Sequence, residues 1–227
     1  MTVNDVLHLY HGSIAVIEKP VFGKGNPGND FGPGFYCTES ENLAKEWACA
    51  FGYSGYANSY TLDVSGLRIL RIEEMSVMEW LSVLLENRAV TIHDSIGQEA
   101  VEYIRRNFHV KLKGYDVLTG YRADDRYFTF VKQFVNNGIG IRTLAQAMKL
   151  GNLGIQVVVK SRRAFDHLEF TGSQPAEESV WAPVYKKRMD GALRDFDRIV
   201  STSKRTEDVY VIDILREGMT VGDPRLL

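Results

Sequence analysis

Cysteine is scarce in this chain of 227 residues, which contains only Cys37 and Cys49. Two cysteines supply neither the disulfide framework of a small secreted domain nor the ligand set of a structural metal site. Cys37 falls inside an apolar, strand-like stretch, so we expect it to be a small core residue. The cysteine content therefore gives no reason to expect a bound metal ion.

Long apolar runs are also absent from the sequence. No stretch approaches the roughly eighteen apolar residues that a membrane-spanning helix needs. Residues 1–5 lack the basic and apolar regions of a secretory signal peptide. We therefore expect a cytoplasmic protein with no membrane partner.

Neither sign of charge dominates the chain, because 27 Lys and Arg residues face 29 Asp and Glu residues, for a net charge of −2. This balance gives no overall attraction to nucleic acid. Hydrophobic residues make up 44% of the chain and charged residues 25%, which is typical of a folded protein and not of a disordered one.

The sequence also lacks a Gly-x-Gly-x-x-Gly segment opening a helix, and it lacks a strand–helix–strand rhythm. Both absences argue against a doubly wound parallel sheet. Apolar runs predict strands at about 7–12, 34–38, 58–64, 67–72, 115–120, 154–160, 168–171 and 208–216. Helical spacing appears at about 40–51, 76–88, 97–107, 124–136, 141–150 and 178–200. These elements favour one α+β domain over residues 1–227, with a helical insert at about 75–108.

A glycine-rich segment, residues 21–34, separates the first two predicted strands. It contains five glycines and two prolines. Such residues permit the unusual backbone angles of turns, so we expect a mobile loop that closes over a ligand.

Two short motifs flank this loop. Tyr10-His11-Gly12-Ser13 ends the first predicted strand, and Gly34-Phe35-Tyr36 opens the second. Taken singly, a His-Gly pair is usually part of a loop, and a Tyr in an apolar strand is usually a core residue. Their order and spacing favour a shared site.

With the helix that follows and a late strand containing Gln156, these motifs resemble those of the ADP-ribosyltransferase superfamily. The similarity is to the branch with a His-Tyr-Glu triad, which includes the poly(ADP-ribose) polymerases and diphtheria toxin. It covers about residues 7–51 and 153–170, including the segment Ala164 to Phe170. The resemblance implies an ADP-ribosyltransferase-like split β-sandwich of antiparallel strands with outer helices and NAD between the sheets.

The resemblance also implies which residues contact NAD. Gly12 would pair its bare backbone with the nicotinamide carboxamide, while His11 and Ser13 would bind ribose hydroxyls. Tyr36 would stack on the nicotinamide ring. Trp47 lies where the polymerase branch has a second aromatic ring, although burial on an amphipathic helix explains it equally well. The remaining implied contacts are Gly34, Phe35 and Ala44.

The third position of the triad departs from the family pattern, because Gln156 stands where Glu is usual. A glutamine keeps the hydrogen bond to the nicotinamide ribose and loses the charge that stabilises the developing cation. Asp124 or Asp125 could supply that charge, although an ordinary helix cap explains the Asp124-Asp125-Arg126 segment as well. The expected catalytic residues are thus Gln156, His11, Tyr36 and Asp125.

The resemblance implies an NAD-dependent mono-ADP-ribosyltransferase, with NAD as co-substrate and no metal. The acceptor would be a macromolecule, either protein or nucleic acid. Residues 39–227 are similar to a little-characterised bacterial toxin-like family, whose members are often encoded beside small antitoxin-like proteins. A toxin with a small antitoxin partner is therefore one expectation. Two alternatives stay open: an NAD glycohydrolase that uses water, and a non-catalytic module that binds NAD or ADP-ribose.

Overall fold

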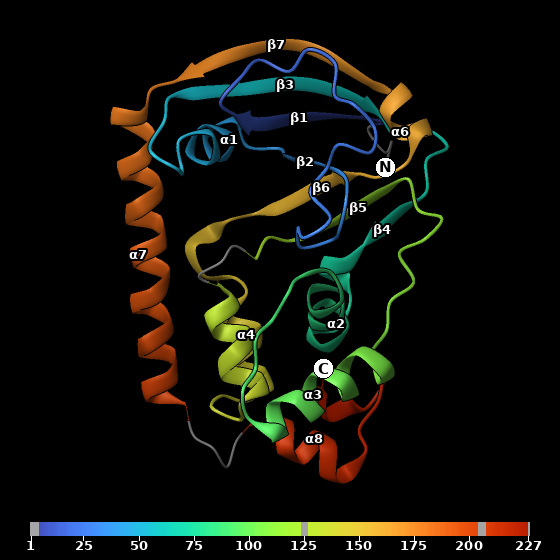
Figure 1. Cartoon of the computed structure of the whole chain (residues 1–227), viewed down its shortest axis with the longest axis vertical. Helices are drawn as coiled ribbons and strands as arrows, with labels where there is room; N and C mark the ends of the chain where they lie inside the picture. The colour runs from blue at the N-terminus through green and yellow to red at the C-terminus, as the bar shows by residue number, and fades with distance from the viewer. Residues whose placement is uncertain (1–4, 124–126, 204–207, 227) are drawn as a thin grey trace.

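The computed structural model describes residues 5–123, 127–203 and 208–226, which fold around a seven-stranded sheet (Figure 1). The strand order is β4-β5-β6-β2-β1-β3-β7. All neighbouring strands run antiparallel except β4 and β5, which are parallel. The predicted α+β class is therefore confirmed. The strands are β1 (Val6–Ser13), β2 (Phe35–Thr38), β3 (Gly55–Asp63), β4 (Ile69–Arg71), β5 (Val117–Tyr121), β6 (Ile155–Val159) and β7 (Leu168–Ala176).

The hydrogen-bonded pairing between β1 and β2 is short. These two strands pair only at Tyr10 and Thr38. In contrast, β1 pairs with β3 along its whole length, from Val6 to Ser13. Among the described strands, the end of β1 that contains His11 thus has no ladder partner on the β2 side. Figure 1 shows the result as an upper layer of β1, β3 and β7 above β6, β5 and β4.

The helices follow the predicted spacing closely. The helix after β2 begins where predicted, because the Ser40 side chain accepts a hydrogen bond from the backbone N–H of Leu43. Two helices occupy the range 75–108, between β4 and β5. The helices are α1 (Glu41–Ala48), α2 (Val77–Asn87), α3 (Ser95–Asn107), α4 (Tyr127–Val135), α5 (Ile141–Ala147), α6 (Arg162–Asp166), α7 (Glu178–Thr202) and α8 (Val211–Glu217).

The predicted strand at 208–216 is wrong, because this segment forms helix α8. Its apolar residues Val211 and Ile214 are buried at a spacing of three, which suits one face of a helix. The side chain of Asp213 accepts a hydrogen bond from the backbone N–H of Tyr210 at the start. Gly218 ends the helix in the left-handed conformation, at φ 63°. These end signals outweigh the high β propensity of Val and Ile.

The strand predicted at 168–171 extends to Ala176 and passes through Pro175. Proline cannot donate to a ladder, so it is tolerated only at an edge or a strand end. β7 is an edge strand, paired with β3 alone, which explains why this proline does not end it.

Two main clusters of apolar side chains lie on opposite faces of the central strands. The larger one packs Phe31, Leu118 and Val158 against α2, α3, α4 and α5. The smaller one contains Leu9, Cys37 and Val157. Cys37 is fully buried, so its predicted core position is confirmed. None of the described helices is both long and apolar enough to cross a membrane.

Candidate active site

The two predicted motifs meet where β1 separates from β2. The Nδ1 atom of His11 lies 2.7 Å from the backbone carbonyl oxygen of Tyr36, a residue 25 positions away. A carbonyl only accepts hydrogen bonds, so Nδ1 carries the proton and Nε2 is left as an acceptor. Burial lowers the pKa of His11, although its bond to Tyr36 opposes this effect. The imidazole is therefore neutral near pH 7.

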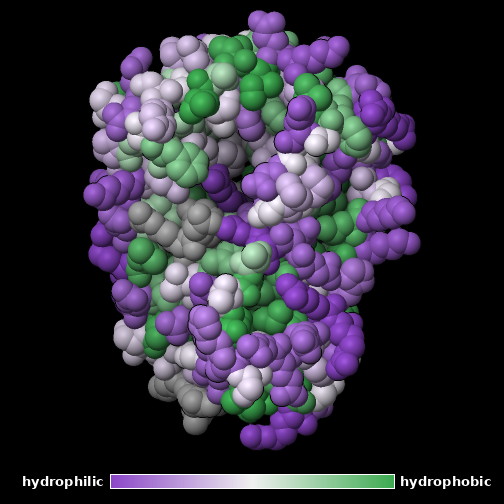
Figure 2. Space-filling model, viewed as in Figure 1, coloured by the Kyte–Doolittle hydropathy of each residue, from purple (hydrophilic) through white to green (hydrophobic). Residues whose placement is uncertain are grey.

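A cavity of about 370 Å³ opens beside this pair. Four of the predicted residues line it, namely His11, Gly34, Phe35 and Tyr36. Two lysines, Lys19 and Lys24, and the ring of Phe165 also line its wall. The volume falls within the range of small-molecule sites, about 300–1,000 Å³. The face of the molecule seen in Figure 2 is hollowed below the upper layer, with hydrophilic residues in the hollow.

Gly12 and Ala44 have structural roles at the contact between β1 and α1. A Cβ atom on Gly12 would lie 2.0 Å from the carbonyl oxygen of Ala44, so only glycine lets the strand approach the helix this closely. Ala44 is fully buried there and is not among the residues that line the cavity of about 370 Å³. Its predicted contact with NAD stays a prediction.

The Ser13 side chain is also engaged in hydrogen bonds with neighbouring protein groups. Its hydroxyl donates to the carbonyl of Ala15 at 2.6 Å and accepts from the amide of Asn58 at 3.0 Å. Asn58 is fully buried and donates to the His11 carbonyl as well. This network holds the end of β1, so the Ser13 hydroxyl would have to exchange a bond in order to bind a ribose.

Trp47 lies on α1, and its ring is covered by an arginine. The guanidinium carbon of Arg122 lies 3.9 Å from the centre of the indole ring, a cation–π contact. Among the described residues, no direct ring contact joins Trp47 to Tyr36, and their stacking on the two faces of a nicotinamide ring stays a prediction. The Nε1 atom of Trp47 is buried and has no hydrogen-bond partner within the described part of the chain.

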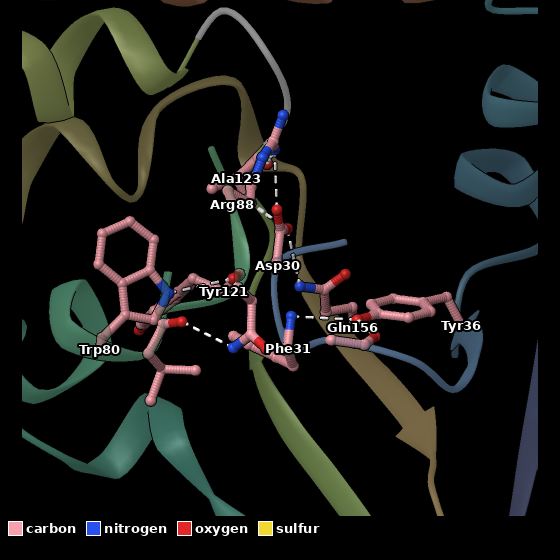
Figure 3. Close-up of polar contacts among 11 residues, drawn as sticks. Asp30, Phe31, Tyr36, Trp80, Arg88, Tyr121, Ala123 and Gln156 are labelled. Carbon is pink, nitrogen blue, oxygen red and sulfur yellow. Dashed lines mark hydrogen bonds and ion pairs between the residues drawn. The ribbon is translucent and has the colours of Figure 1, made fainter. Parts of the chain in front are cut away.

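Gln156 is the second residue of β6, where it pairs with Thr38 of β2 and Gly120 of β5. Because Tyr36 lies two residues before Thr38, Tyr36 and Gln156 lie on the same face of neighbouring strands. Gln156 is only 3% exposed. Its Nε2 atom donates to Oδ2 of Asp30 at 3.0 Å (Figure 3). Tyr10 pairs with Thr38, so Tyr10 shares this face, whereas the His11 ring packs against Phe35, with the ring centres 4.4 Å apart. The structure thus joins His11 to the backbone of Tyr36, and Gln156 is not among the residues that line the cavity.

Asp30 is the main residue of this site that the predictions from sequence missed. It lies in the glycine-rich loop, yet it is only 6% exposed. Its carboxylate accepts from Nη1 of Arg88 at 2.9 Å and from the backbone N–H of Ala123 at 2.9 Å, besides Gln156. Burial raises the pKa of Asp30, while these N–H groups and the charge of Arg88 lower it. All three partners are donors, so we assign the ionised carboxylate at neutral pH.

Part of the loop around Asp30 is held firmly. The Tyr36 hydroxyl accepts from the Phe31 N–H at 3.0 Å and donates to the Gly32 carbonyl at 2.6 Å. The Nζ atom of Lys160 donates to the Phe31 carbonyl at 2.7 Å. A Cβ on Gly120 would meet the Phe31 ring at 2.6 Å. Residues 30–32 are therefore buried, whereas most of 21–29 is exposed, so the expectation of a mobile loop applies only to its first part.

The signal for Asp30 was present in the sequence. Asp30-Phe31-Gly32 directly precedes the Gly34-Phe35-Tyr36 motif, but an Asp in a glycine-rich loop usually forms a turn. Asp124 and Asp125, the predicted sources of charge, lie outside the described residues. Within the described part of the chain, no group of three or more His, Cys, Asp or Glu side chains is arranged to hold a metal ion.

Comparison with known sequences identifies the family but not the activity. Residues 7–170 match the sequence model of a family described as "Protein of unknown function (DUF3990)". No curated protein matches the chain, and no solved structure matches it. The match covers more than half of the chain and includes His11, Tyr36, Asp30 and Gln156. The chain therefore belongs to the DUF3990 family.

Proposed function

We propose that this protein is an NAD-dependent mono-ADP-ribosyltransferase. One observation carries the proposal: His11 of β1 is bonded to the backbone of Tyr36 on β2, and β2 pairs directly with β6, which contains Gln156. These are the positions that the resemblance assigns to the His-Tyr-Glu triad. The separation of β1 from β2 also supports the split β-sandwich that this superfamily uses.

The proposed reaction transfers one ADP-ribose unit. The bond between C1′ of the nicotinamide ribose and the ring nitrogen breaks, and its electron pair leaves with neutral nicotinamide. An oxygen or nitrogen nucleophile of the acceptor then forms a bond to C1′ and loses a proton. The site must favour positive charge on the ribose and hold it near the nucleophile. Gln156 offers an amide oxygen for the first purpose and no full charge, which favours slow transfer without chain growth.

The unpartnered groups of the site match NAD in their chemistry. Nε2 of His11, which lines the cavity, is an acceptor for a ribose hydroxyl. Lys19 and Lys24 supply positive charge in the cavity wall for a diphosphate. The hydroxyl bonds of Tyr36 fix its ring, and Tyr36 lines the cavity, which supports its role as the stacking partner of the nicotinamide ring.

The proposal extends to a biological role. The similarity of residues 39–227 to a toxin-like family supports the role of a toxin, with a small antitoxin protein encoded nearby as its expected partner. The proposed acceptor is a protein or a nucleic acid, and the labelling experiment described below distinguishes the two.

A binding module is the second candidate, and Gln156 favours it. Without a carboxylate at this position, the chain could hold NAD or ADP-ribose and leave it intact. An NAD glycohydrolase differs from the transferase only in using water as the nucleophile.

Incubation of the purified chain with NAD labelled in the adenosine part and with cell lysate tests the proposal. We expect label in macromolecules, and its loss on treatment with protease or nuclease identifies the acceptor class. Free labelled ADP-ribose alone would identify a glycohydrolase. Intact NAD after prolonged incubation would contradict both and favour the binding module.

A further inference from the structure

Asp30 and Gln156 form a buried pair of carboxylate and amide inside the proposed site. They lie 126 residues apart in sequence. Asp30 is 6% exposed to solvent and Gln156 is 3% exposed. Burying a carboxylate costs several kcal/mol unless donors compensate it. Here three donors do so: Arg88, the Ala123 N–H and the Gln156 amide. Such a costly arrangement in a candidate site calls for a functional explanation.

The pair fixes the orientation of the Gln156 amide. An ionised carboxylate only accepts hydrogen bonds, so the NH₂ group of Gln156 must face Asp30. The amide oxygen, Oε1, then faces away from Asp30, as Figure 3 shows. Among the residues that the structure describes, none donates a hydrogen bond to Oε1. A largely buried side chain thus presents an acceptor without a donor.

Tyr36 lies on the same side as this unpartnered oxygen. Figure 3 draws Gln156 between Asp30 and Tyr36, and the pairing of β2 with β6 places both side chains on one sheet face. A ligand that stacked on Tyr36 would therefore lie on the same sheet face as Oε1.

Arg88 keeps Asp30 in place. Its Nη1 atom donates to both Asp30 and the Ala123 carbonyl, the second at 2.6 Å. Its guanidinium carbon also lies 4.2 Å from the centre of the Phe128 ring. With Arg88 fixed on two sides, the carboxylate cannot rotate away from Gln156 without losing a charge-assisted bond.

We propose that Asp30 is a positioning residue that makes Gln156 act in place of the family's glutamate. By accepting from Nε2, it holds Oε1 toward the nicotinamide ribose as a hydrogen-bond acceptor for a ribose hydroxyl. The negative carboxylate also polarises the amide and increases the electron density on Oε1. Because Arg88 balances the charge of Asp30, the effect is mainly one of orientation. This inference rests on the proposed transferase function.

Exchange of the two groups tests the inference. Asp30→Asn leaves two amides facing each other, and Gln156→Glu leaves two carboxylates. The double variant Asp30→Asn/Gln156→Glu restores an amide facing a carboxylate, with the carboxylate now at position 156. Nicotinamide release from NAD gives kcat and KM for each protein, and thermal unfolding shows whether each is folded. Asp208→Asn is the control, because Asp208 caps α5 through the N–H groups of Arg142 and Thr143.

We expect Asp30→Asn to lower kcat by about 10- to 100-fold, since misplacing a reacting group commonly has effects of this size, with KM changed less than kcat. The double variant recovers at least the parent kcat, and the Asp208→Asn control keeps it. If Asp30→Asn turns over like the parent, or if the folded double variant stays as slow as Asp30→Asn, the inference is wrong and the transferase function stands. If the parent releases no nicotinamide, both the function and the inference fail.

Discussion

The Nδ1 atom of His11 donates a hydrogen bond to the backbone carbonyl of Tyr36, across the gap where β1 and β2 no longer pair. This side-chain bond takes the place of a backbone hydrogen bond between β1 and β2, beyond the one position where these strands pair. It also fixes the imidazole ring so that Nε2 stays available to a ligand. A single side chain thus joins the two halves of the sheet and forms part of the cavity wall.

His11→Ala should weaken NAD binding by about 1–3 kcal/mol, because it removes a hydrogen-bonding group from the cavity. Calorimetric titration with NAD measures the change. Asp195→Asn, an exposed change on α7, is the control and should bind like the parent. Equal affinity in His11→Ala and the parent would place the NAD site elsewhere.

Gly12→Ala should lower the stability of the whole fold. The new Cβ would lie 2.0 Å from the Ala44 carbonyl oxygen, so β1 and α1 must move apart. Such overpacking typically costs about 1–3 kcal/mol. Gly191→Ala in α7 is the matched control, since its nearest neighbour lies 3.9 Å from the new Cβ. Chemical unfolding should show a loss in the first variant and no loss in the second, and equal stability would refute the close contact.

Glu46→Gln should destabilise the contact between α1 and α7. Glu46 is 1% exposed, and both its oxygens accept from Arg188 at 2.8 Å. Breaking one partner of a buried ion pair costs about 3 kcal/mol. The exposed pair Asp195–Arg198 offers a comparison, and Asp195→Asn should cost about 1 kcal/mol at most. A similar free energy of unfolding for both variants would show that burial does not matter here.

The stability of the fold should rise between pH 8 and pH 10.5 through Lys160. Burial lowers the pKa of Lys160 to about 8, from its usual 10.5. In this window the unfolded chain keeps the proton and the folded chain has lost it, so folding releases a proton and high pH favours the folded state. The free energy of unfolding of the parent, minus that of Lys160→Met, should therefore increase with pH. A difference that stays flat would contradict the lowered pKa.

The glycine-rich loop should respond to NAD in its first part only. Residues 30–32 are buried, and the Phe31 N–H already donates to Tyr36. Most of residues 21–29 are exposed beside the cavity. Hydrogen exchange should therefore be slow at Phe31 without ligand, and NAD should slow exchange within 21–29. Unchanged exchange in 21–29 on adding saturating NAD would argue against closure of the loop.

Local patterns in the sequence predicted most of the helices and strands. Ser40 caps α1 as expected, and Cys37 is a core residue. The segment 208–216 was misjudged because its Val and Ile residues suit both a strand and a short helix. Only the ends, with Asp213 and the left-handed Gly218, decide between them. Structure that depends on contacts within a few residues could therefore be predicted. A segment whose apolar residues suit both a strand and a helix could not.

The site was predictable only where its residues form short motifs. His11 and Tyr36 were found from such motifs, and both line the cavity. Gly12 and Ala44 were assigned to a ligand, but their proximity arises from packing between a strand and a helix. The bonds from Asp30 to Arg88 and Gln156 span 58 and 126 residues. A short sequence motif cannot indicate contacts between residues so far apart in the chain, so this part of the site became visible only in the structure.

The most direct test of the account is release of nicotinamide from NAD by the purified chain, followed by chromatography. The account predicts slow release by the parent above the rate in buffer. In His11→Ala it predicts a loss of about 5- to 150-fold at subsaturating NAD, which corresponds to the 1–3 kcal/mol expected for the lost hydrogen bond. Asp195→Asn should match the parent. Release at the buffer rate by the folded parent, with acceptor present, would contradict the account.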